Sequence, residues 1–230
     1  CDECRNCGFY EGNIYLAVGC PTAMLTAQRE STREYFMGSP HIDCEYNNVH
    51  YHLTIVGCFV YPQGYAAVTE HLHNMTGVNM VVDIGNGTAN ILQINNKKPI
   101  EEKCVTEKLG VNQYIIAVQK AVMAAYGKKI DPEVVELFIR NGDTNVSDNY
   151  KNIFREEAEK YCRKIFDALY RCEYDPDFMK LYVCGGVKLI RHFGNYCSDR
   201  VIFIDDICAT AKGYQQFALK SLKALEKRSE

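Results

Sequence analysis

The chain has 230 residues and a mass of 26.2 kDa, which is enough to bury a substantial hydrophobic core. Apolar residues make up 47% and charged residues 24%, a composition that excludes an intrinsically disordered chain. The formal net charge of −3 argues against a broad phosphate-binding surface, and therefore against direct contact with nucleic acid. No apolar run approaches the roughly 20 residues of a membrane helix, and the first residues have no signal-peptide pattern. We therefore expect a cytoplasmic protein that makes no contact with membranes.

Two groups stand out among the twelve cysteines. One lies within apolar runs and is predicted to form small buried side chains in a reducing cytoplasm: Cys20, Cys58, Cys184 and Cys208. The other, Cys1, Cys4 and Cys7, has the C-x-x-C spacing of metal ligands. A zinc site needs four ligands, however, and no second pair follows. The sequence leaves open whether these three bind a metal or belong to a cysteine-rich terminus.

Strands dominate the first 100 residues. Apolar and β-branched runs predict strands at 14–20 and 49–61, the second being one long strand or a pair. The charged segment 26–36 is predicted to be an exposed helix or loop, and 66–75 a short helix. Residues 79–94 predict a β-hairpin, with two apolar strands around a Gly-rich turn and a further turn directly after it.

Helices dominate the rest of the chain. The apolar spacing of 110–126 predicts an amphipathic helix, and Asp131 followed by Pro132 is typical of a helix start. The remaining predicted elements are a long helix at 150–170, a buried strand at 181–184, a helix at 187–193, a strand at 201–204, and a final helix that Asp205 and Asp206 cap and that runs to about residue 227. Because strands and helices alternate, the predicted fold class is α/β or mixed.

The segment Asp83–Thr88, with the sequence Asp-Ile-Gly-Asn-Gly-Thr, is the strongest local signal for chemistry. A strand delivers the Asp83 carboxylate to a turn in which Gly85 and Gly87 can take positive φ. Such a turn presents several backbone N–H groups on one side, as a nest for phosphate oxygens, and Thr88 adds a hydroxyl. A divalent cation, Mg²⁺, would relieve the repulsion between Asp83 and a phosphate. The alternative is a plain hairpin, because Asn-Gly is a favoured hairpin turn.

Three further segments are weak signals on their own. Gly185 and Gly186 follow a buried strand and open a helix, which allows a ligand to approach the backbone closely. The alternative is a tight strand–helix turn. Pro62-Gln63-Gly64-Tyr65 ends a strand and is otherwise a simple turn. Residues 207–214 place small side chains and a glycine in a helical stretch, which permits close helix packing.

Taken in chain order, these four segments resemble the actin-like ATPase superfamily. The order is Pro-Gln-Gly at a strand end, Asp-x-Gly-x-Gly-Thr, strand-Gly-Gly-helix and Ala-x-Ala-x-Gly-Tyr, and the likeness extends from about Ile14 to Ala218. Within the superfamily, the chain looks most like the bacterial ParM/StbA plasmid-segregation actins. The resemblance implies an actin-like (ribonuclease H-like) ATPase fold, an α/β architecture with mixed sheets flanked by helices.

The resemblance also implies roles for two of the segments that face phosphate. The turn after Asp83 would be the second phosphate hairpin, and Asp83 would organise Mg²⁺ and its waters. The residues that would hold phosphate are Gly85, Asn86, Gly87 and Thr88. Gln63, in the first interdomain connection, would orient the attacking water, because an amide acts by positioning rather than by taking a proton.

The nucleoside would lie against the second glycine segment. By the resemblance, the residues that line it are Gly185, Gly186 and Val187, although Val187 stands where a third glycine or alanine is usual. Residues 209–214 would form the second interdomain connection. No local motif fixes the ribose contacts, but a suitable predicted helix carries Glu156, Glu157 and Lys160.

The resemblance implies an N-terminally incomplete chain. The family uses two phosphate hairpins, and Asp83 begins the only Asp-x-Gly segment of this sequence, which opens at Cys1 rather than Met. The expected parts are the end of domain I at 1–76, domain II at 77–205, and a last helix at 206–230 that returns to domain I. Such a chain should bind nucleotide weakly and hydrolyse it poorly, because half of the phosphate clamp is absent.

The function that the resemblance implies is that of a polymerising ATPase. It would bind and hydrolyse ATP or GTP with Mg²⁺, form filaments, and move plasmid DNA through a DNA-binding adaptor. Two alternatives stay open: a degenerate actin-like scaffold without ATPase activity, and an ATP-dependent activator or sugar-kinase relative of the same fold. In the last case, the terminal cysteines would suggest an iron–sulfur centre.

Two His-x-His pairs are weaker metal candidates. On a strand, His50 and His52 share one face and could reach one metal ion, whereas His71 and His73 on a helix could not. Half-buried strand histidines are the simpler interpretation of the first pair.

Overall fold

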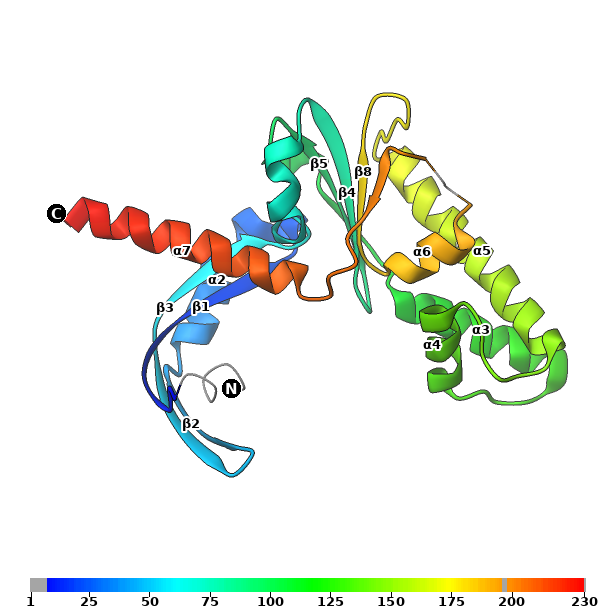
Figure 1. Cartoon of the computed structure of the whole chain (residues 1–230), viewed down its shortest axis with the longest axis horizontal. Helices are drawn as coiled ribbons and strands as arrows, with labels where there is room; N and C mark the ends of the chain where they lie inside the picture. The colour runs from blue at the N-terminus through cyan, green and yellow to red at the C-terminus, as the bar shows by residue number, and fades with distance from the viewer. Residues whose placement is uncertain (1–7, 196–197, 230) are drawn as a thin grey trace.

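The computed structural model describes residues 8–195 and 198–229 of the chain. Within these residues the strands form two sheets, a small curved one near the N-terminus and a larger one in the middle of the molecule (Figure 1). The cysteine cluster Cys1, Cys4 and Cys7 lies outside the described residues.

The small sheet has the strand order β1-β3-β2. Its strands are β1 (Glu11–Cys20), β2 (His41–Tyr46) and β3 (Val49–Pro62). The last is one long strand that runs parallel to β1 and antiparallel to β2. The strands predicted at 14–20 and 49–61 are therefore confirmed.

The apolar pattern does not predict β2, because polar and charged side chains make up most of it. Its pairing with β3 depends on the turn residues Asn47 and Asn48, whose φ angles are 51° and 59°. Two consecutive residues with positive φ match the twist of a tight hairpin, and asparagine adopts that conformation more readily than most residues.

The first helix of the chain packs on the small sheet. α2 (Leu25–Met37) follows a 3₁₀ turn, η1 (Thr22–Met24), and packs its apolar side against β1 and β3. Leu25 of the helix is buried there together with Cys20, Cys58 and Val60 of the strands. The segment predicted as an exposed helix or loop is thus a helix, with most of its residues exposed.

The large sheet has the order β6-β5-β4-β8-β9, with β7 also paired to β5. Its strands are β4 (Val78–Ile84), β5 (Ala89–Asn95), β6 (Lys98–Pro99), β7 (Val105–Glu107), β8 (Leu181–Gly185) and β9 (Val201–Phe203). β4 and β5 form the predicted antiparallel hairpin, while β8 runs parallel to β4 on its other side. This mixed sheet places the ends of β4 and β8 side by side.

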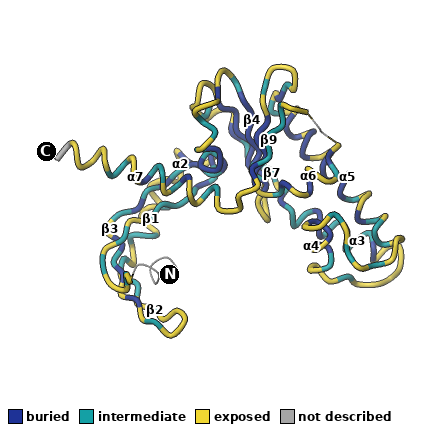
Figure 2. The backbone as a smooth tube through the Cα atoms, viewed as in Figure 1, coloured by how far each residue is buried: buried dark blue, intermediate teal, exposed yellow. Residues whose placement is uncertain are grey.

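Helices cover both faces of the large sheet (Figure 1). On one face lie α3 (Val111–Tyr126), α4 (Pro132–Asn141), α5 (Asp148–Arg171) and α6 (Val187–Phe193). On the other lies η2 (Ala66–Asn74), a 3₁₀ helix where a short helix was expected, and η3 (Glu101–Lys103) is a further short turn. Alternate residues of β4 point to the two faces, so Val82 packs under the helices and Val81 against η2. Many of the buried residues lie in this sheet (Figure 2).

The last helix, α7 (Ala209–Ser229), leaves the large sheet and runs back along the small one (Figure 1). Asp205 and Asp206 were both expected to cap this helix, and only Asp206 lies in a capping position. Asp206 Oδ1 accepts from the Cys208 N–H at 2.9 Å, next to the helix start, whereas Asp205 Oδ2 is 2.8 Å from Arg191 Nη2. At α4 the expected start is confirmed, because Asp131 accepts from the Glu133 N–H at 2.9 Å.

Three of the four cysteines predicted to be buried are buried: Cys20, Cys58 and Cys184. The prediction for Cys208 is wrong, because this thiol lies in the exposed turn that precedes α7. Among the described helices, none has the length and the apolar character needed to cross a membrane.

Candidate functional site

The turn between β4 and β5 is tied to the start of α3. The carbonyls of Gly85, Asn86 and Gly87 accept hydrogen bonds from the N–H groups of Val111, Asn112 and Gly110, at 3.0, 2.9 and 3.3 Å. The first amides of a helix have no partner within the helix, so here the turn satisfies them in place of a capping side chain.

The opposite side of the turn carries unpaired donors. Within the described residues, the N–H groups of Asn86, Gly87 and Thr88 donate to no protein acceptor, and residues 85–88 are exposed. Only the Gly85 N–H is used, by the Thr88 carbonyl at 2.8 Å. A row of free amides on an exposed turn suits an anion.

The expectation of positive φ at Gly85 and Gly87 is wrong, since neither residue lies in the left-handed region. The glycine that the turn requires is Gly110. A Cβ there would collide with the backbone of Asn86 and Gly87, so only glycine lets α3 start this close to the turn. The contact that shapes the turn comes from another element of the chain, so the sequence of the turn alone does not reveal it.

Asp83 is the last polar residue of β4 before the turn. Burial raises the pKa of its carboxyl above the ordinary value, and within the described residues the side chain accepts no hydrogen bond. Its neighbours across the sheet are Asn90 on β5 and Cys184 on β8. A partly accessible carboxylate without a protein partner is one that a bound cation could satisfy.

Gln63 lies beside Asp83. Its backbone N–H donates to the Cys20 carbonyl at 2.9 Å, and its backbone carbonyl accepts from Thr22 Oγ1 at 2.7 Å. Asn90 Nδ2, from the residue opposite Asp83, is 3.5 Å from Gln63 Oε1, a long contact. The next residue, Gly64, is packed against Asp83, since a Cβ built on it would lie 3.3 Å from the Asp83 Cβ. The Gln63–Gly64 segment and Asp83 therefore lie side by side where β3 leaves the small sheet.

Tyr214 of α7 reaches the same point. A Cβ built at Gly19 would overlap its hydroxyl, so Gly19 makes room for this ring at the end of β1. Burial, followed by the nearby Asp83 carboxylate, raises the pKa of Tyr214. The two predicted connections, at Gln63 and at Tyr214, thus meet at one place.

Gly185 and Gly186 link β8 to α6. Gly185 has a φ of +74°, and a Cβ on it would collide with the Ile84 carbonyl. The Gly186 N–H donates to that same carbonyl at 2.9 Å. Both glycines are therefore required for the ends of β4 and β8 to meet, as the alternative of a tight strand–helix turn predicts. They also line a cavity.

That cavity has a volume of about 380 Å³ and lies between the β4–β5 turn, α3, α4 and the start of α6. It joins the two glycine segments, since its lining includes Gly85, Asn86, Gly185 and Gly186. Val187 is not part of the lining; it points into the core beneath α6 and is buried. Its expected place against a nucleoside stays a prediction.

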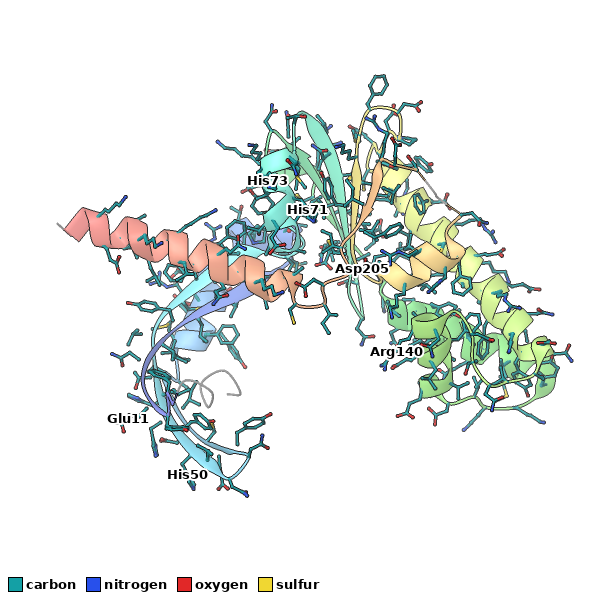
Figure 3. The ribbon with its side chains drawn as sticks, in the orientation of Figure 1. Glu11, His50, His71, His73, Arg140 and Asp205 are labelled. Carbon is teal, nitrogen blue, oxygen red and sulfur yellow. The ribbon has the colours of Figure 1, made fainter. Side chains whose placement is uncertain are left out.

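Three charged residues that the sequence analysis missed also line this cavity: Glu136, Arg140 and Lys188. Glu136 and Arg140 lie one turn apart on α4 and form an ion pair at 3.2 Å. Lys188 Nζ donates to the Arg140 carbonyl at 3.2 Å and so joins α6 to α4. Arg140 lies in the last turn of α4 (Figure 3). Only the packing of α4 beside α6 reveals these residues, because opposite charges four residues apart are common on any exposed helix.

The helix proposed for ribose contacts lies elsewhere. Glu157 and Lys160 form an ion pair at 2.6 Å on the side of α5 that faces α3, and Glu156 is exposed. None of the three lines the cavity at the glycine segments.

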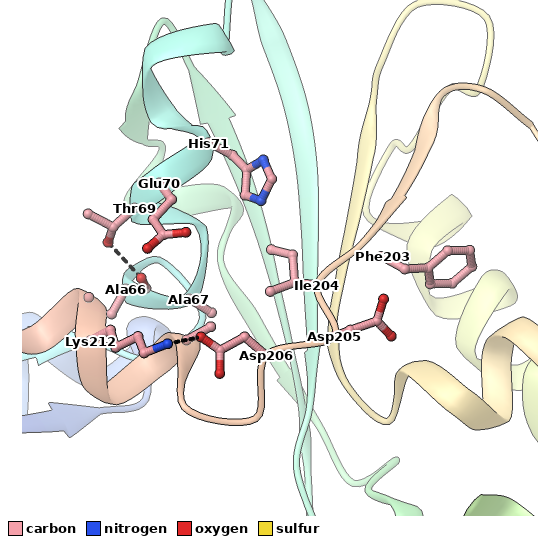
Figure 4. A pocket seen from close by; sticks show the side chains of 12 residues that line it. Ala66, Ala67, Thr69, Glu70, His71, Phe203, Ile204, Asp205, Asp206 and Lys212 are labelled. Atoms are coloured by element: carbon pink, nitrogen blue, oxygen red, sulfur yellow. Dashed lines mark hydrogen bonds and ion pairs between the residues drawn. The ribbon is translucent and has the colours of Figure 1, made fainter. Parts of the chain in front are cut away.

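A second, smaller cavity of about 160 Å³ lies where α7 meets η2 (Figure 4). Its walls include Ala66 and Thr69 of η2, and the ion pair Asp206–Lys212, at 2.6 Å, closes one side. A Cβ on Gly213 would collide with the Ala66 carbonyl, so this glycine sets how closely α7 approaches η2.

The histidine pairs do not form metal sites. His50 lies at the far end of the small sheet (Figure 3). His50 and His52 are both exposed, and they pair across the hairpin with Glu45 and Asp43. The His71 ring packs on Tyr182, with centroids 5.7 Å apart. In the part of the chain that the structure describes, no three His, Cys, Asp or Glu side chains are arranged to hold a metal ion.

Comparisons with known proteins place this geometry in a class. Residues 81–193, just under half of the chain, match the family model of the C-terminal part of archaeal MreB-like actin homologues. Comparison with curated proteins found no match.

Several solved structures have the same fold at low sequence identity. An archaeal actin homologue is 17% identical, with a TM-score of 0.75 over 90% of this chain and 70% of its own. ParM from Bacillus thuringiensis, solved with ATP, is 15% identical, with a TM-score of 0.67 over 95% of this chain and 70% of its own. ParM in a 15-stranded filament from Clostridium botulinum is 18% identical, with a TM-score of 0.69 over 88% of this chain and 66% of its own.

The chain therefore has the fold of the actin-like ATPase superfamily, with mixed sheets flanked by helices. Within that class, the sequence match is to the MreB-like C-terminal domain, and the structural neighbours include both archaeal actin homologues and bacterial ParM.

Proposed function

We propose that this chain is an actin-like protein that binds ATP or GTP with Mg²⁺ and assembles into filaments. The observation that carries the proposal is the joining of two distant glycine segments, Gly85–Asn86 and Gly185–Gly186, around one cavity. An archaeal actin homologue of the same fold has been solved with ADP, and ParM with ATP.

The phosphates belong at the β4–β5 turn. The free N–H groups of Asn86, Gly87 and Thr88 would donate to phosphate oxygens, and the bonds to α3 hold the turn in place before ligand arrives. In this proposal the nucleoside occupies the cavity, where Glu136 would accept from ribose hydroxyls. Arg140 and Lys188 would supply positive charge beside it.

Asp83 fits Mg²⁺ held through water. Its carboxyl is a hard oxygen donor without a protein partner, and a cation would favour the ionised form that burial disfavours. When bound, Mg²⁺ would neutralise charge that develops on the transferred phosphoryl group. Gln63, fixed through its backbone to Cys20 and Thr22, would orient the attacking water.

We extend the proposal to assembly. ParM, which shares the fold, has been solved in a 15-stranded filament, which supports self-association here. The proposed role is the segregation of plasmid DNA in the cytoplasm through a DNA-binding adaptor, with the domain division at 1–76, 77–205 and 206–230. The acidic net charge fits an adaptor better than direct contact with DNA.

Calorimetry with ATP and with GTP, each with and without Mg²⁺, tests the nucleotide site. Asp83→Ala should abolish the part of the affinity that depends on Mg²⁺, and Arg140→Ala should weaken binding about tenfold in both conditions, because it removes a charge-assisted contact. The matched control is Asp177→Ala, which removes an exposed carboxylate far from both glycine segments. Light scattering after nucleotide addition reports assembly.

Equal effects of Asp83→Ala and Asp177→Ala would contradict the phosphate site at the turn. A folded wild-type chain that binds neither nucleotide would favour the degenerate scaffold.

A further inference from the structure

A separate cavity of about 280 Å³ lies between α3 and α5, on the side of α3 that faces away from the proposed nucleotide site. Residues of α3 alternate between the two cavities: Val111 and Ile115 line the first, whereas Gln113 and Ala117 line the second. The two cavities share no lining residue.

The cavity between α3 and α5 is strongly cationic. Its lining includes Lys108 before α3, Lys120 on α3, and Lys160 and Lys164 on α5. One carboxylate, Glu157, is also present, and it pairs with Lys160 at 2.6 Å. Within the described residues, the other three lysines form no ion pair. This concentration of uncompensated positive charge occurs in a chain whose formal net charge is −3.

Apolar side chains lie between the lysines, and hydrogen bonds fix the two tyrosines beneath them. Tyr161 Oη donates to the Leu109 carbonyl at 2.6 Å, and Tyr114 Oη donates to the Phe154 carbonyl at 3.1 Å. Both hydroxyls are therefore occupied, and both rings are buried beneath the cavity, while the half-buried Ile116 and Ala117 also line it. Mutual repulsion of several ammonium groups around one hollow is unfavourable unless an anion enters it.

We propose that this cavity, the α3–α5 lysine pocket, binds a small organic molecule that carries two or more phosphate groups. Lysine ammonium groups bind phosphate as mobile point charges, and the aliphatic side chains between them accept an apolar body. A concave site of this volume suits a compact ligand better than a polymer that lies along a surface. The site is independent of the nucleotide site, because none of its lysines lines the other cavity.

The test is calorimetric titration of the full chain with inorganic tripolyphosphate, a compact polyanion. Lys108→Gln with Lys164→Gln removes two unpaired charges of the pocket and should weaken binding about tenfold. The matched control, Lys223→Gln with Lys227→Gln, removes two exposed charges of α7 and should change the affinity less than twofold. Circular dichroism and thermal melting check that both variants fold.

A second variant moves the affinity in the other direction. Glu157→Gln removes the carboxylate of the pocket and frees Lys160, so tripolyphosphate should bind several-fold more tightly. Equal losses in the two lysine variants, or no loss in either, would overturn the proposal. The proposal would also be overturned if a short single-stranded oligonucleotide bound through Lys108 and Lys164 and tripolyphosphate did not bind. The ligand would then be a nucleic acid. Asp83→Ala separates the two sites, since it should leave tripolyphosphate binding at the pocket unchanged.

Discussion

At the scale of single residues, Asp83 has the most unusual environment. Most carboxylates in the described chain are exposed, and several form ion pairs, whereas Asp83 is largely buried and accepts no hydrogen bond from the described protein. A group kept in this state costs stability in the absence of ligand. We therefore attribute its presence to function rather than to folding.

Asp83→Asn should make the ligand-free chain more stable at neutral pH while it abolishes Mg²⁺-dependent nucleotide binding. Because burial raises the carboxyl pKa in the folded chain, the folded state holds its proton longer than the unfolded state. Stability therefore falls as pH rises from the ordinary carboxyl range through the raised pKa. We expect the melting temperature to rise by about 2–4 °C at pH 7, the usual size of a 1 kcal/mol change in a chain of this length.

The pH dependence supplies the control for this prediction. The advantage of Asp83→Asn should shrink on acidification and vanish where Asp83 is protonated in both states. A constant difference between the two melting curves from neutral to acid pH would show that charge is not the cause.

At the scale of elements, the β4–β5 turn and α3 act as one unit. Three carbonyls of the turn satisfy the first N–H groups of the helix, and Gly110 is the residue that permits the contact. A turn fixed by a neighbouring helix needs no left-handed glycine of its own, which explains why Gly85 and Gly87 have ordinary φ angles.

Gly110→Ala should destabilise the fold by about 1–3 kcal/mol, because its Cβ has no room beside the backbone of Asn86 and Gly87. It should also weaken nucleotide binding through displacement of the turn. Gly87→Ala is the matched control: a Cβ there meets no atom within 4 Å, and the stability should stay within about 0.5 kcal/mol. Urea denaturation of both variants checks the prediction, and a larger loss for Gly87→Ala would refute it.

Pattern and composition were enough to predict most elements. Apolar periodicity located β4, β5 and α3, and the Asp131–Pro132 start located α4. The strand β2 was missed because its side chains are polar and its partner, β3, supplies the reason to pair. The signal that could have found it is Asn47-Asn48, two residues that tolerate positive φ in a tight hairpin turn.

The candidate site could be predicted only in part, for a related reason. Glycine segments can be found locally, because each requires special backbone geometry or close approach. Glu136 and Arg140 could not, because their importance depends on α4 lying beside α6. For Val187, the position relative to two glycines does not reveal that the first turn of α6 buries this side chain in the core.

At the scale of the whole molecule, the two sheets are joined by the segment at Gln63 and by the start of α7. Aromatic rings hold α7 in place: Phe217 lies 5.4 Å from both Tyr61 and Tyr65, measured between ring centroids. Tyr61 also shares a hydrogen bond with Ser221 at 3.0 Å. The connection is therefore packed on α7 over more than one turn.

Phe217→Ala should lower the free energy of unfolding by about 1–3 kcal/mol, since it removes the ring that bridges Tyr61 and Tyr65. Leu219→Ala, on the exposed side of the same helix, should have little effect, because that side chain is 50% exposed. Guanidinium unfolding of the two variants makes the comparison. If Leu219→Ala were the more damaging, the packing of α7 described above would be wrong.

The union of the turn with α3 has a consequence for the energetics of ligand capture. The peptide planes at 85–87 already have a fixed orientation in the empty protein, so their conformational entropy was lost during folding rather than at the moment of encounter. The amide hydrogens of Val111 and Asn112 should therefore exchange slowly with deuterated solvent even without ligand, while those of Gly87 and Thr88 exchange fast. Ligand should then slow only the second pair, which would identify the turn as a preformed receptor.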